Sequence, residues 1–201
     1  MSLPLLLASA SPRRRELLER VGVPLEVRPA DVDENPLAGE QPGAYVARIA
    51  HAKAINVKRR PGQWVLAADT TVTIDGWILG KAESPEEATT MLKQLAGRVH
   101  QVITAFRLVG DVDDAPFHRD GLISSDVVVV ALDDAQIADY VASGEWRGKA
   151  GAYAIQGIGA ALVREVRGSV TNVIGLPLVE VLEALRAVGA PSGKLAAGIP
   201  A

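Results

Sequence analysis

The chain has 201 residues, of which 48% are hydrophobic and 22% are charged, and its formal net charge at pH 7 is -3. That length provides for one substantial core or for two small lobes that share one. The mildly acidic balance argues against stable binding of nucleic acid, which needs clustered Lys and Arg. The absence of cysteine excludes disulfides, thiolate metal sites and a cysteine nucleophile.

The apolar stretch at the amino terminus does not have the charge order of a signal peptide. No Lys or Arg precedes it, and Arg13, Arg14 and Arg15 follow it, whereas a signal peptide begins with its positive charges. No segment approaches the ~20 consecutive apolar residues of a membrane span. We therefore expect a cytoplasmic protein that does not bind membranes.

The hydrophobic pattern of the first half predicts strands and helices in alternation. Short apolar runs bounded by turn residues indicate strands, and an apolar spacing of three to four residues indicates helices. The expected elements, in chain order, are a strand at 5–8, a helix from Ser11 and Pro12 to Gly22, a strand at 25–27, an acidic loop at 29–41, a helix at 44–57, a strand at 64–68, and a hairpin of 71–74 and 77–79 around Asp75 and Gly76. A Ser-Pro pair suits a helix start, and Asp-Gly suits a type I′ turn.

The second half is expected to add longer strands and to end in a helix. Its elements are a helix from Ser84 and Pro85, strands at 99–109 and 122–132 joined by an irregular charged loop, a helix from Asp133 to about Ala142, strands at 152–155 and 161–166, a helix at 178–188 and a frayed tail at 190–201. Because several strands pair by hairpins, the sheet should be mixed. We expect an α/β fold with one domain over residues 1–189.

The segment from Ala8 to Leu18 carries two serines and three arginines at a helix start. Free backbone N–H groups and the positive end of the helix dipole attract anions there, and arginine donates paired hydrogen bonds that match phosphate oxygens. Ser9, Arg13 and Arg14 are therefore candidates for a triphosphate cradle, and the alternative is a capped surface helix with solvated arginines. The chain has no Walker-type glycine-rich loop and no G-x-G-x-x-G motif.

Asp69 follows the apolar run of a predicted strand, and Thr70 comes next. Strand ends are where an α/β sheet presents its reactive groups. A carboxylate at this place can hold a divalent metal or accept a proton from water. In isolation, an aspartate that caps a turn explains the same residue.

Further charges lie in the acidic loop, in the second helix and after the hairpin. Asp31, Asp33 and Glu34 supply oxygen ligands of the kind that magnesium and manganese prefer, unless the loop is merely solvated. Lys53 and Lys81 could bind phosphates as point charges, although surface lysines without such a role look the same in a sequence.

A glycine-rich region runs from Gly148 to Gly157 and continues with a second group at 168–178. This density of glycine indicates close backbone approach or positive φ angles. Gln156 is a polar side chain at the end of a predicted apolar strand, and its amide has the donor and acceptor needed to read the edge of uracil or thymine. The alternative is a set of packing glycines with an ordinary exposed glutamine. The three histidines, His51, His100 and His118, have no metal-ligand spacing.

Taken in order, these segments resemble the Maf family of nucleoside triphosphate pyrophosphatases, and the likeness runs from about Leu5 to Val188. It rests on the motifs Ser9-x-Ser11-Pro12-Arg13-Arg14-x-Glu16-Leu17-Leu18, Ala68-Asp69-Thr70, Gly80-Lys81, Lys149-Ala150-Gly151-Ala152-Tyr153-x-Ile155-Gln156-Gly157 and Val173-Ile174-Gly175-Leu176-Pro177-Leu178. The resemblance implies a strongly twisted mixed sheet flanked by helices, with a cleft between two lobes, as in inosine-triphosphatase-like proteins.

The resemblance also implies hydrolysis between the α- and β-phosphates with a divalent cation, Mg, Mn or Co. By carry-over, Ser9, Arg13, Arg14, Lys53 and Lys81 would bind the phosphates. Glu34 and Asp69 would hold the metal, and Asp69 would also accept the proton of the attacking water. These two roles of Asp69 compete, since a metal-bound carboxylate is a weakened base.

Within the family, Arg13, Thr70 and Gln156 match the branch that is similar to dTTP/UTP pyrophosphatases. The alternatives are the branch that acts on 7-methyl-GTP and a noncatalytic nucleotide-binding regulator of septum formation. The family suggests removal of noncanonical nucleotides, and the likeness alone suggests a homodimer. Ala82, where the family usually has proline, and Ala96 and Ala105 depart from the pattern without touching the assigned residues.

Overall fold

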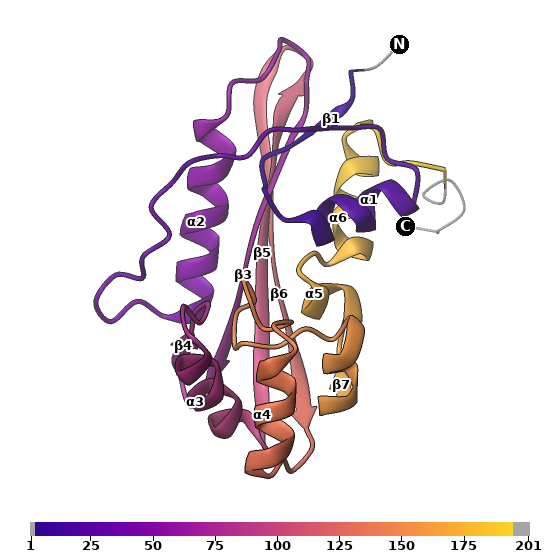
Figure 1. The fold of residues 1–201 in the computed structure, drawn as a ribbon. Coiled ribbons are helices and arrows are strands. Elements are labelled where there is room, and N and C mark those ends of the chain that lie inside the picture. Colours follow the sequence, from indigo (N-terminus) through magenta and orange to yellow (C-terminus); the bar gives the residue numbers. More distant parts are fainter. Residues whose placement is uncertain (1–2, 195–201) are drawn as a thin grey trace.

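A mixed sheet of seven strands organises the computed structural model, which describes residues 3–194 (Figure 1). The strands are β1 (Leu5–Leu7), β2 (Leu25–Val27), β3 (Val65–Ile74), β4 (Trp77–Leu79), β5 (Val99–Val112), β6 (Ala115–Val129) and β7 (Val163–Arg167). The helices are α1 (Pro12–Arg20), α2 (Pro42–Asn56), α3 (Pro85–Leu95), α4 (Asp134–Ala142), α5 (Val170–Ile174) and α6 (Leu178–Ala187), with a 3-10 helix at Gly157–Leu162.

The sheet has the order β2-β1-β3-β5-β6-β7, and β4 pairs with β3 off this path. Strand β1 is parallel to both β2 and β3, while β5, β6 and β7 join as an antiparallel series. The α/β fold with a mixed sheet that the sequence predicts is therefore confirmed.

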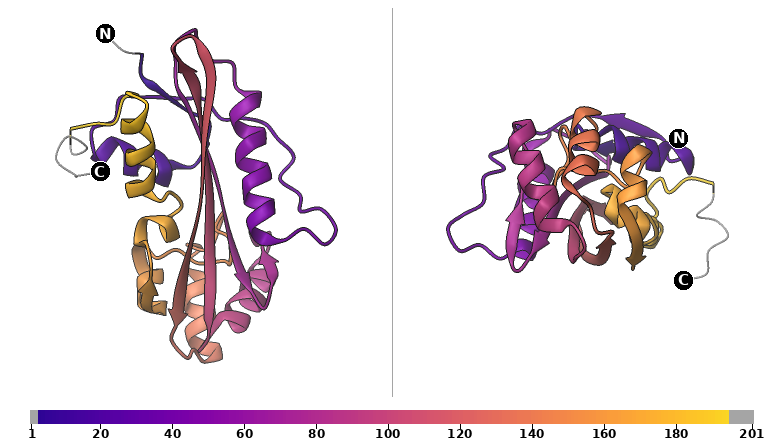
Figure 2. Two further views of the ribbon diagram at one scale, coloured as in Figure 1. Left: turned by 180° about the vertical axis from the view of Figure 1, so that it is seen from behind. Right: turned by 60° about the horizontal axis from the view of Figure 1, so that its bottom comes forward.

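Alternation along the strands sends neighbouring side chains to opposite faces of the sheet. Leu5 and Leu7 pack in the cluster that includes residues of α1 and α6, whereas Leu6 packs with Ala54 of α2. Seen from behind, α2 and the pair α1 and α6 lie on opposite sides of the long β5–β6 hairpin (Figure 2).

A second hydrophobic cluster fills the other end of the sheet. Leu92 of α3, Ile137 of α4 and Trp146 pack there against residues of β3 and β5. The same strands also supply the first cluster, since Leu66, Phe106 and others from β3 and β5 belong to it. Strand β6 contributes to both clusters as well, since Val127 belongs to the second and Ile123 packs against the first. Three strands thus connect the two clusters.

The predicted strand at 64–68 is too short. Strand β3 runs without interruption to Ile74, so Asp69 lies inside a strand and not at its end. The tight turn predicted at Asp75 and Gly76 is confirmed, because both residues have positive φ, 53° and 81°.

The prediction of an irregular loop between residues 109 and 122 is also wrong. Strands β5 and β6 remain paired to Val112 and Ala115, and Asp113 and Asp114 alone form the turn. Their φ angles of 49° and 62° are those of the primed turns that match strand twist.

The strand predicted at 152–155 does not form. Ala152 has a φ of 57°, which is incompatible with an extended strand, and the following residues make turns and bends. Of the tail predicted at 190–201, Ala190 is buried in the first cluster, and residues 195–201 lie outside the described part. Among residues 3–194 no helix is long and apolar enough to cross a bilayer.

Candidate active site

The site begins at a gap along one edge of β3. Strand β1 pairs with β3 at Val65 and Leu66, and β4 pairs with it only from Val72. Within the described chain, the intervening edge at 67–71 has no strand partner on the side opposite β5.

The connections around this gap make it a topological switch point. Helix α1 leaves the carboxyl end of β1 on one face of the sheet, and α2 returns to β3 on the other (Figure 1). Crevices at such points are where open α/β sheets bind ligands.

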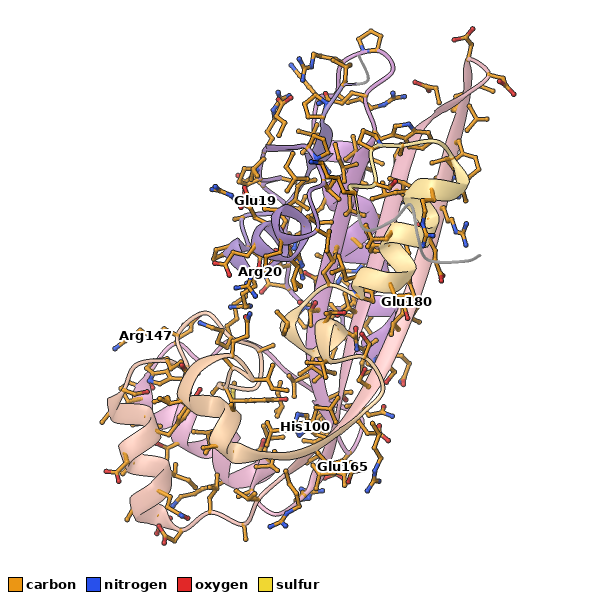
Figure 3. All side chains as sticks on the ribbon, turned by 90° about the vertical axis from the view of Figure 1, so that its right-hand side faces the viewer. Glu19, Arg20, His100, Arg147, Glu165 and Glu180 are labelled. Carbon is orange, nitrogen blue, oxygen red and sulfur yellow. The ribbon has the colours of Figure 1, made fainter. Side chains whose placement is uncertain are left out.

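A cavity of about 310 Å³ occupies this position. Figure 3 shows α1, marked by Glu19 and Arg20, facing the turn that carries Arg147. The lining residues come from the β1–α1 turn, α2, β3, β5 and two later loops: Ser9–Arg14, Glu34, Lys53, Asp69, Thr70, Val72, Lys81, Val102, Gly148–Ala150, Tyr153–Gln156 and Val173–Gly175. All nine residues predicted for the site, Ser9, Arg13, Arg14, Glu34, Lys53, Asp69, Thr70, Lys81 and Gln156, are among them.

The most buried charges of the cavity meet at Lys53. Its Nζ atom lies 2.8 Å from Asp69 Oδ1 and 2.6 Å from Glu34 Oε1. Helix α2 brings Lys53 to β3, and the loop before α2 brings Glu34. The Lys53 ammonium group therefore holds the carboxylates of Glu34 and Asp69 close enough together for one small cation to contact both.

Glu34 connects this centre to the cavity rim. Its second oxygen, Oε2, lies 3.2 Å from the exposed Nζ of Lys81. Burial opposes ionisation of Glu34, but the hydrogen bonds and positive charges of Lys53 and Lys81 outweigh it and lower the pKa of this carboxyl. Glu34 is therefore an anion that is available to a cation.

Arg14 fixes the other wall through hydrogen bonds to neutral acceptors. Its guanidinium donates to Gly175 O at 2.7 Å, to Ser9 Oγ at 3.1 Å and to Thr70 Oγ1 at 3.0 Å. Burial lowers its pKa, against the opposing charge of Asp69. Since Thr70 Oγ1 also contacts Thr104 Oγ1 at 2.9 Å, Arg14 and Thr70 link α1, β3, β5 and the loop after α5.

Arg13 and Lys149 also line the cavity and, like Arg14, form no ion pair with a carboxylate within residues 3–194. Arg13 donates from Nε to Ile174 O at 3.2 Å, and Lys149 donates to Arg147 O at 2.9 Å. Burial and then the charge of Arg13 lower the pKa of Lys149. Lys149 was not among the predicted site residues. The signal that could have identified it is a positive charge inside the glycine-rich motif.

The cavity has an apolar end where it borders the second hydrophobic cluster. Val72, Val102, Tyr153, Ile155 and Val173 are among its lining residues. Gln156 adjoins them as the residue before the 3-10 helix, not at a strand end as predicted, and its side chain has no hydrogen-bond partner within residues 3–194. A polar, charged end and an apolar end with one amide suit the two halves of a nucleotide.

The carboxylates fit a divalent cation that shares its ligands with a substrate. Mg²⁺ is commonly bound by one or two carboxylates, with phosphate oxygens and water completing the shell. Asp69 and Glu34 provide such a pair, and no group of three or more His, Asp or Glu in the described chain forms a complete cage. Of the other predicted acids, Asp33 accepts from Asn35, and neither it nor Asp31 lines the cavity.

The fold and the cavity define an α/β protein with a charged cavity at the carboxyl end of β1, beside the middle of β3. The chain belongs to the Maf family, since the model of that family, described as Maf-like protein, matches residues 4–188.

Named relatives resemble the chain over nearly their whole length. A dTTP/UTP pyrophosphatase of Anaeromyxobacter dehalogenans (strain 2CP-1) is 50% identical over 187 residues, which cover 93% of this chain and 95% of the relative. One of Myxococcus xanthus is 48% identical over 189 residues, covering 93% of each chain. Among solved structures, the Staphylococcus aureus Ham1 protein aligns with a TM-score of 0.40 and 16% identity, over 63% of this chain and 72% of that one.

Proposed function

We propose that this protein is a nucleoside triphosphate pyrophosphatase that converts dTTP and UTP to the monophosphate and pyrophosphate. The observation that carries the proposal is the convergence of Arg13, Lys53, Glu34 and Asp69 on one cavity. Relatives of about half-identical sequence bear the name of this activity.

The reaction needs charge stabilisation more than covalent chemistry, because negative charge builds on phosphate oxygens. Water attacks the α-phosphorus, the bond to the bridging oxygen breaks and pyrophosphate leaves. Arg13 of α1 would bind the polyphosphate together with Lys81 and Lys149, whose segments are joined by the bridge between Lys81 and Ala150. Arg14 would hold Ser9 and Thr70 in place.

Asp69 is the proposed acceptor of the water proton. Oδ1 accepts from Lys53, so the attacking water and the metal would compete for Oδ2. Lys53 orients the Asp69 carboxylate, and Glu34 balances the positive charge of Lys53. Glu34 and Asp69 would hold Mg²⁺, Mn²⁺ or Co²⁺, which supplies positive charge to the phosphate oxygens when bound.

The base would occupy the apolar end of the cavity. The Gln156 amide can donate to a carbonyl and accept from the ring N–H of uracil or thymine. Valine side chains and Tyr153 would surround the ring. Modified uracil nucleotides whose substituent lies away from this edge, as at C5, keep the same carbonyl and ring N–H, so we include such modified pyrimidine nucleotides among the substrates.

Pyrophosphate release from a panel of triphosphates, with each of the three metals, tests the proposal. We expect UTP and dTTP to be hydrolysed in preference to CTP, GTP and 7-methyl-GTP. Preference for 7-methyl-GTP would assign the protein to the other branch, and tight nucleotide binding without turnover would make it a regulator. A cytoplasmic location and a homodimer stay predictions.

Asp69→Asn should lower kcat at least ~100-fold, the range of a lost acid–base group. The matched control is Asp120→Asn, which removes an exposed carboxylate paired with Arg107 and should leave kcat unchanged. Near-normal turnover in Asp69→Asn would remove Asp69 from the chemistry.

A further inference from the structure

Both oxygens of the Glu145 carboxylate accept hydrogen bonds from the loop that follows Gln156. Oε1 accepts from the amide of Ile158 at 3.0 Å, and Oε2 accepts from the amide of Gly159 at 2.7 Å. Glu145 lies in the turn after α4, on the segment marked by Arg147 in Figure 3. One side chain thus connects this turn to the loop.

The glycines of the loop are what allow the carboxylate to approach. A Cβ atom on Gly157, whose φ is +84°, would lie 2.0 Å from Glu145 Oε1. A Cβ atom on Gly159 would lie 2.2 Å from Ala154 O and 3.1 Å from Glu145 Oε2. Any larger residue at either position would displace the carboxylate or the loop.

No strand supports the residues that present Gln156. The segment makes bends, and the amide of Ala154 donates to the Tyr140 hydroxyl at 3.2 Å. Tyr140 belongs to α4, so both anchors come from one structural unit. The Gln156 amide itself has no partner within residues 3–194, and its position therefore follows from the backbone that these anchors hold.

We propose that Glu145 is a positioning residue for base selection, which holds the Gln156 loop at the apolar end of the cavity through its two backbone hydrogen bonds. The proposal rests on the proposed function and adds a specificity role for a residue that lines no part of the cavity. Charge-assisted hydrogen bonds to a backbone are shorter and stronger than neutral ones, so loss of the carboxylate should loosen the loop.

The decisive variant is Glu145→Gln, which keeps the size of the side chain but replaces one acceptor by a donor. We expect the ratio of kcat/KM for UTP to that for CTP to fall at least about fivefold, mainly through a higher KM for UTP. The kcat at saturating UTP should stay within about twofold of the wild-type value. Glu145→Asp retains the carboxylate and should recover part of the ratio.

Asp139→Asn is the matched control, because it removes an exposed carboxylate from α4 without touching the loop. Its UTP/CTP ratio should equal that of the wild type. A folded Glu145→Gln with an unchanged ratio would overturn the proposal, as would an equal loss of kcat on both nucleotides with KM unchanged.

Hydrogen exchange separates this proposal from the proposed function. The amides of Ile158 and Gly159 should exchange at least about tenfold faster in Glu145→Gln, and not in Asp139→Asn. Unchanged exchange overturns the anchoring role whatever the enzyme hydrolyses. If the wild type releases no pyrophosphate from any nucleotide, the proposed function fails. The ratio of the affinities for UMP and CMP, measured for the wild type and for Glu145→Gln, then replaces the kinetic ratio.

Discussion

Lys53 is the residue on which the electrostatics of the cavity depend. Its side chain is only 8% exposed and contacts Asp69, which is nearly as buried, and Glu34. Removal of one partner from a buried charge group leaves the others uncompensated. A divalent cation is the natural replacement for the missing ammonium charge.

We therefore expect Lys53→Met to lose most activity. Without metal, its free energy of unfolding should be about 1–3 kcal/mol lower than that of the wild type, the cost of leaving a buried acceptor unsatisfied. Addition of Mg²⁺ or Mn²⁺ should raise the melting temperature more in this variant than in the wild type. Lys58→Met, at an exposed lysine just after α2, is the control. An equal effect of metal on both proteins would contradict the idea that the carboxylates are the cation site.

His100 makes stability depend on pH. It is buried, its Nε2 lies 2.8 Å from the Tyr153 hydroxyl, and burial lowers its pKa to about 4 against the opposing charge of Asp126. The unfolded chain protonates histidine near pH 6.5, so it binds more protons than the folded state between these values. Stability should fall as pH decreases from about 6.5 towards 4, by up to ~1.4 kcal/mol per pH unit.

Urea unfolding at pH 7 and pH 5.5 measures this effect. His100→Phe should flatten the dependence in this window, while His51→Gln, at an exposed position of α2, should keep it. The same slope in His100→Phe and in the wild type would assign the effect to other groups.

At the scale of elements, α2 holds the loop that supplies Glu34. Arg48 of α2 binds both oxygens of Glu40 at 2.7 Å and donates to Asn35 O at 3.0 Å. The Tyr45 hydroxyl donates to Glu34 O at 2.9 Å. Arg48, followed by the backbone amide of Leu37, lowers the pKa of Glu40 to about 2, so this anchor persists over the whole physiological range.

Arg48→Met should free the loop and raise the metal concentration for half-maximal activity by about three- to tenfold, while kcat at saturating metal changes less than about twofold. Arg59→Met is a matched control, because Arg59 makes an equivalent paired contact with Asp111. If both variants need the same metal concentration, the loop does not position Glu34 through Arg48.

Elements whose ends have local chemical markers could be predicted from the sequence. The capping box of Asp133 and Gln136 begins α4, and Ser84 caps α3. The β5–β6 turn was missed because two consecutive aspartates with positive φ lack the Asp-Gly pattern. The strand predicted at 152–155 failed because Ala152 has a positive φ and the amide of Ala154 donates to the Tyr140 hydroxyl, which no local pattern reveals.

For the whole molecule, the site residues could be named but not their contacts. Arg14 donates to Gly175 across 161 positions of sequence, and Lys53 meets Asp69 across 16. Such pairs follow from the order of strands in the sheet. Ordered motifs that resemble a family therefore selected residues that line one cavity, while their side-chain partners required the fold.

The two hydrophobic clusters should unfold together, because β3 and β5 pass through both. Trp64 lies in one cluster and Trp146 in the other, while Trp77 is exposed. In a Trp77→Phe background, proteins that keep only Trp64 or only Trp146 should report one common urea midpoint. Separate midpoints would contradict the single domain that we expect over residues 1–189.

The open edge of β3 at 67–71 has a consequence for solubility. An unpaired strand edge is ordinarily a place where another chain can add and start aggregation. Here most residues of the edge are buried, and Arg14 and Lys53 bind Thr70 and Asp69 on it, so two charged side chains oppose such an addition. The residues that we propose to bind the substrate would thus also oppose self-association, and we expect variants that neutralise them to precipitate more readily as well as to be inactive.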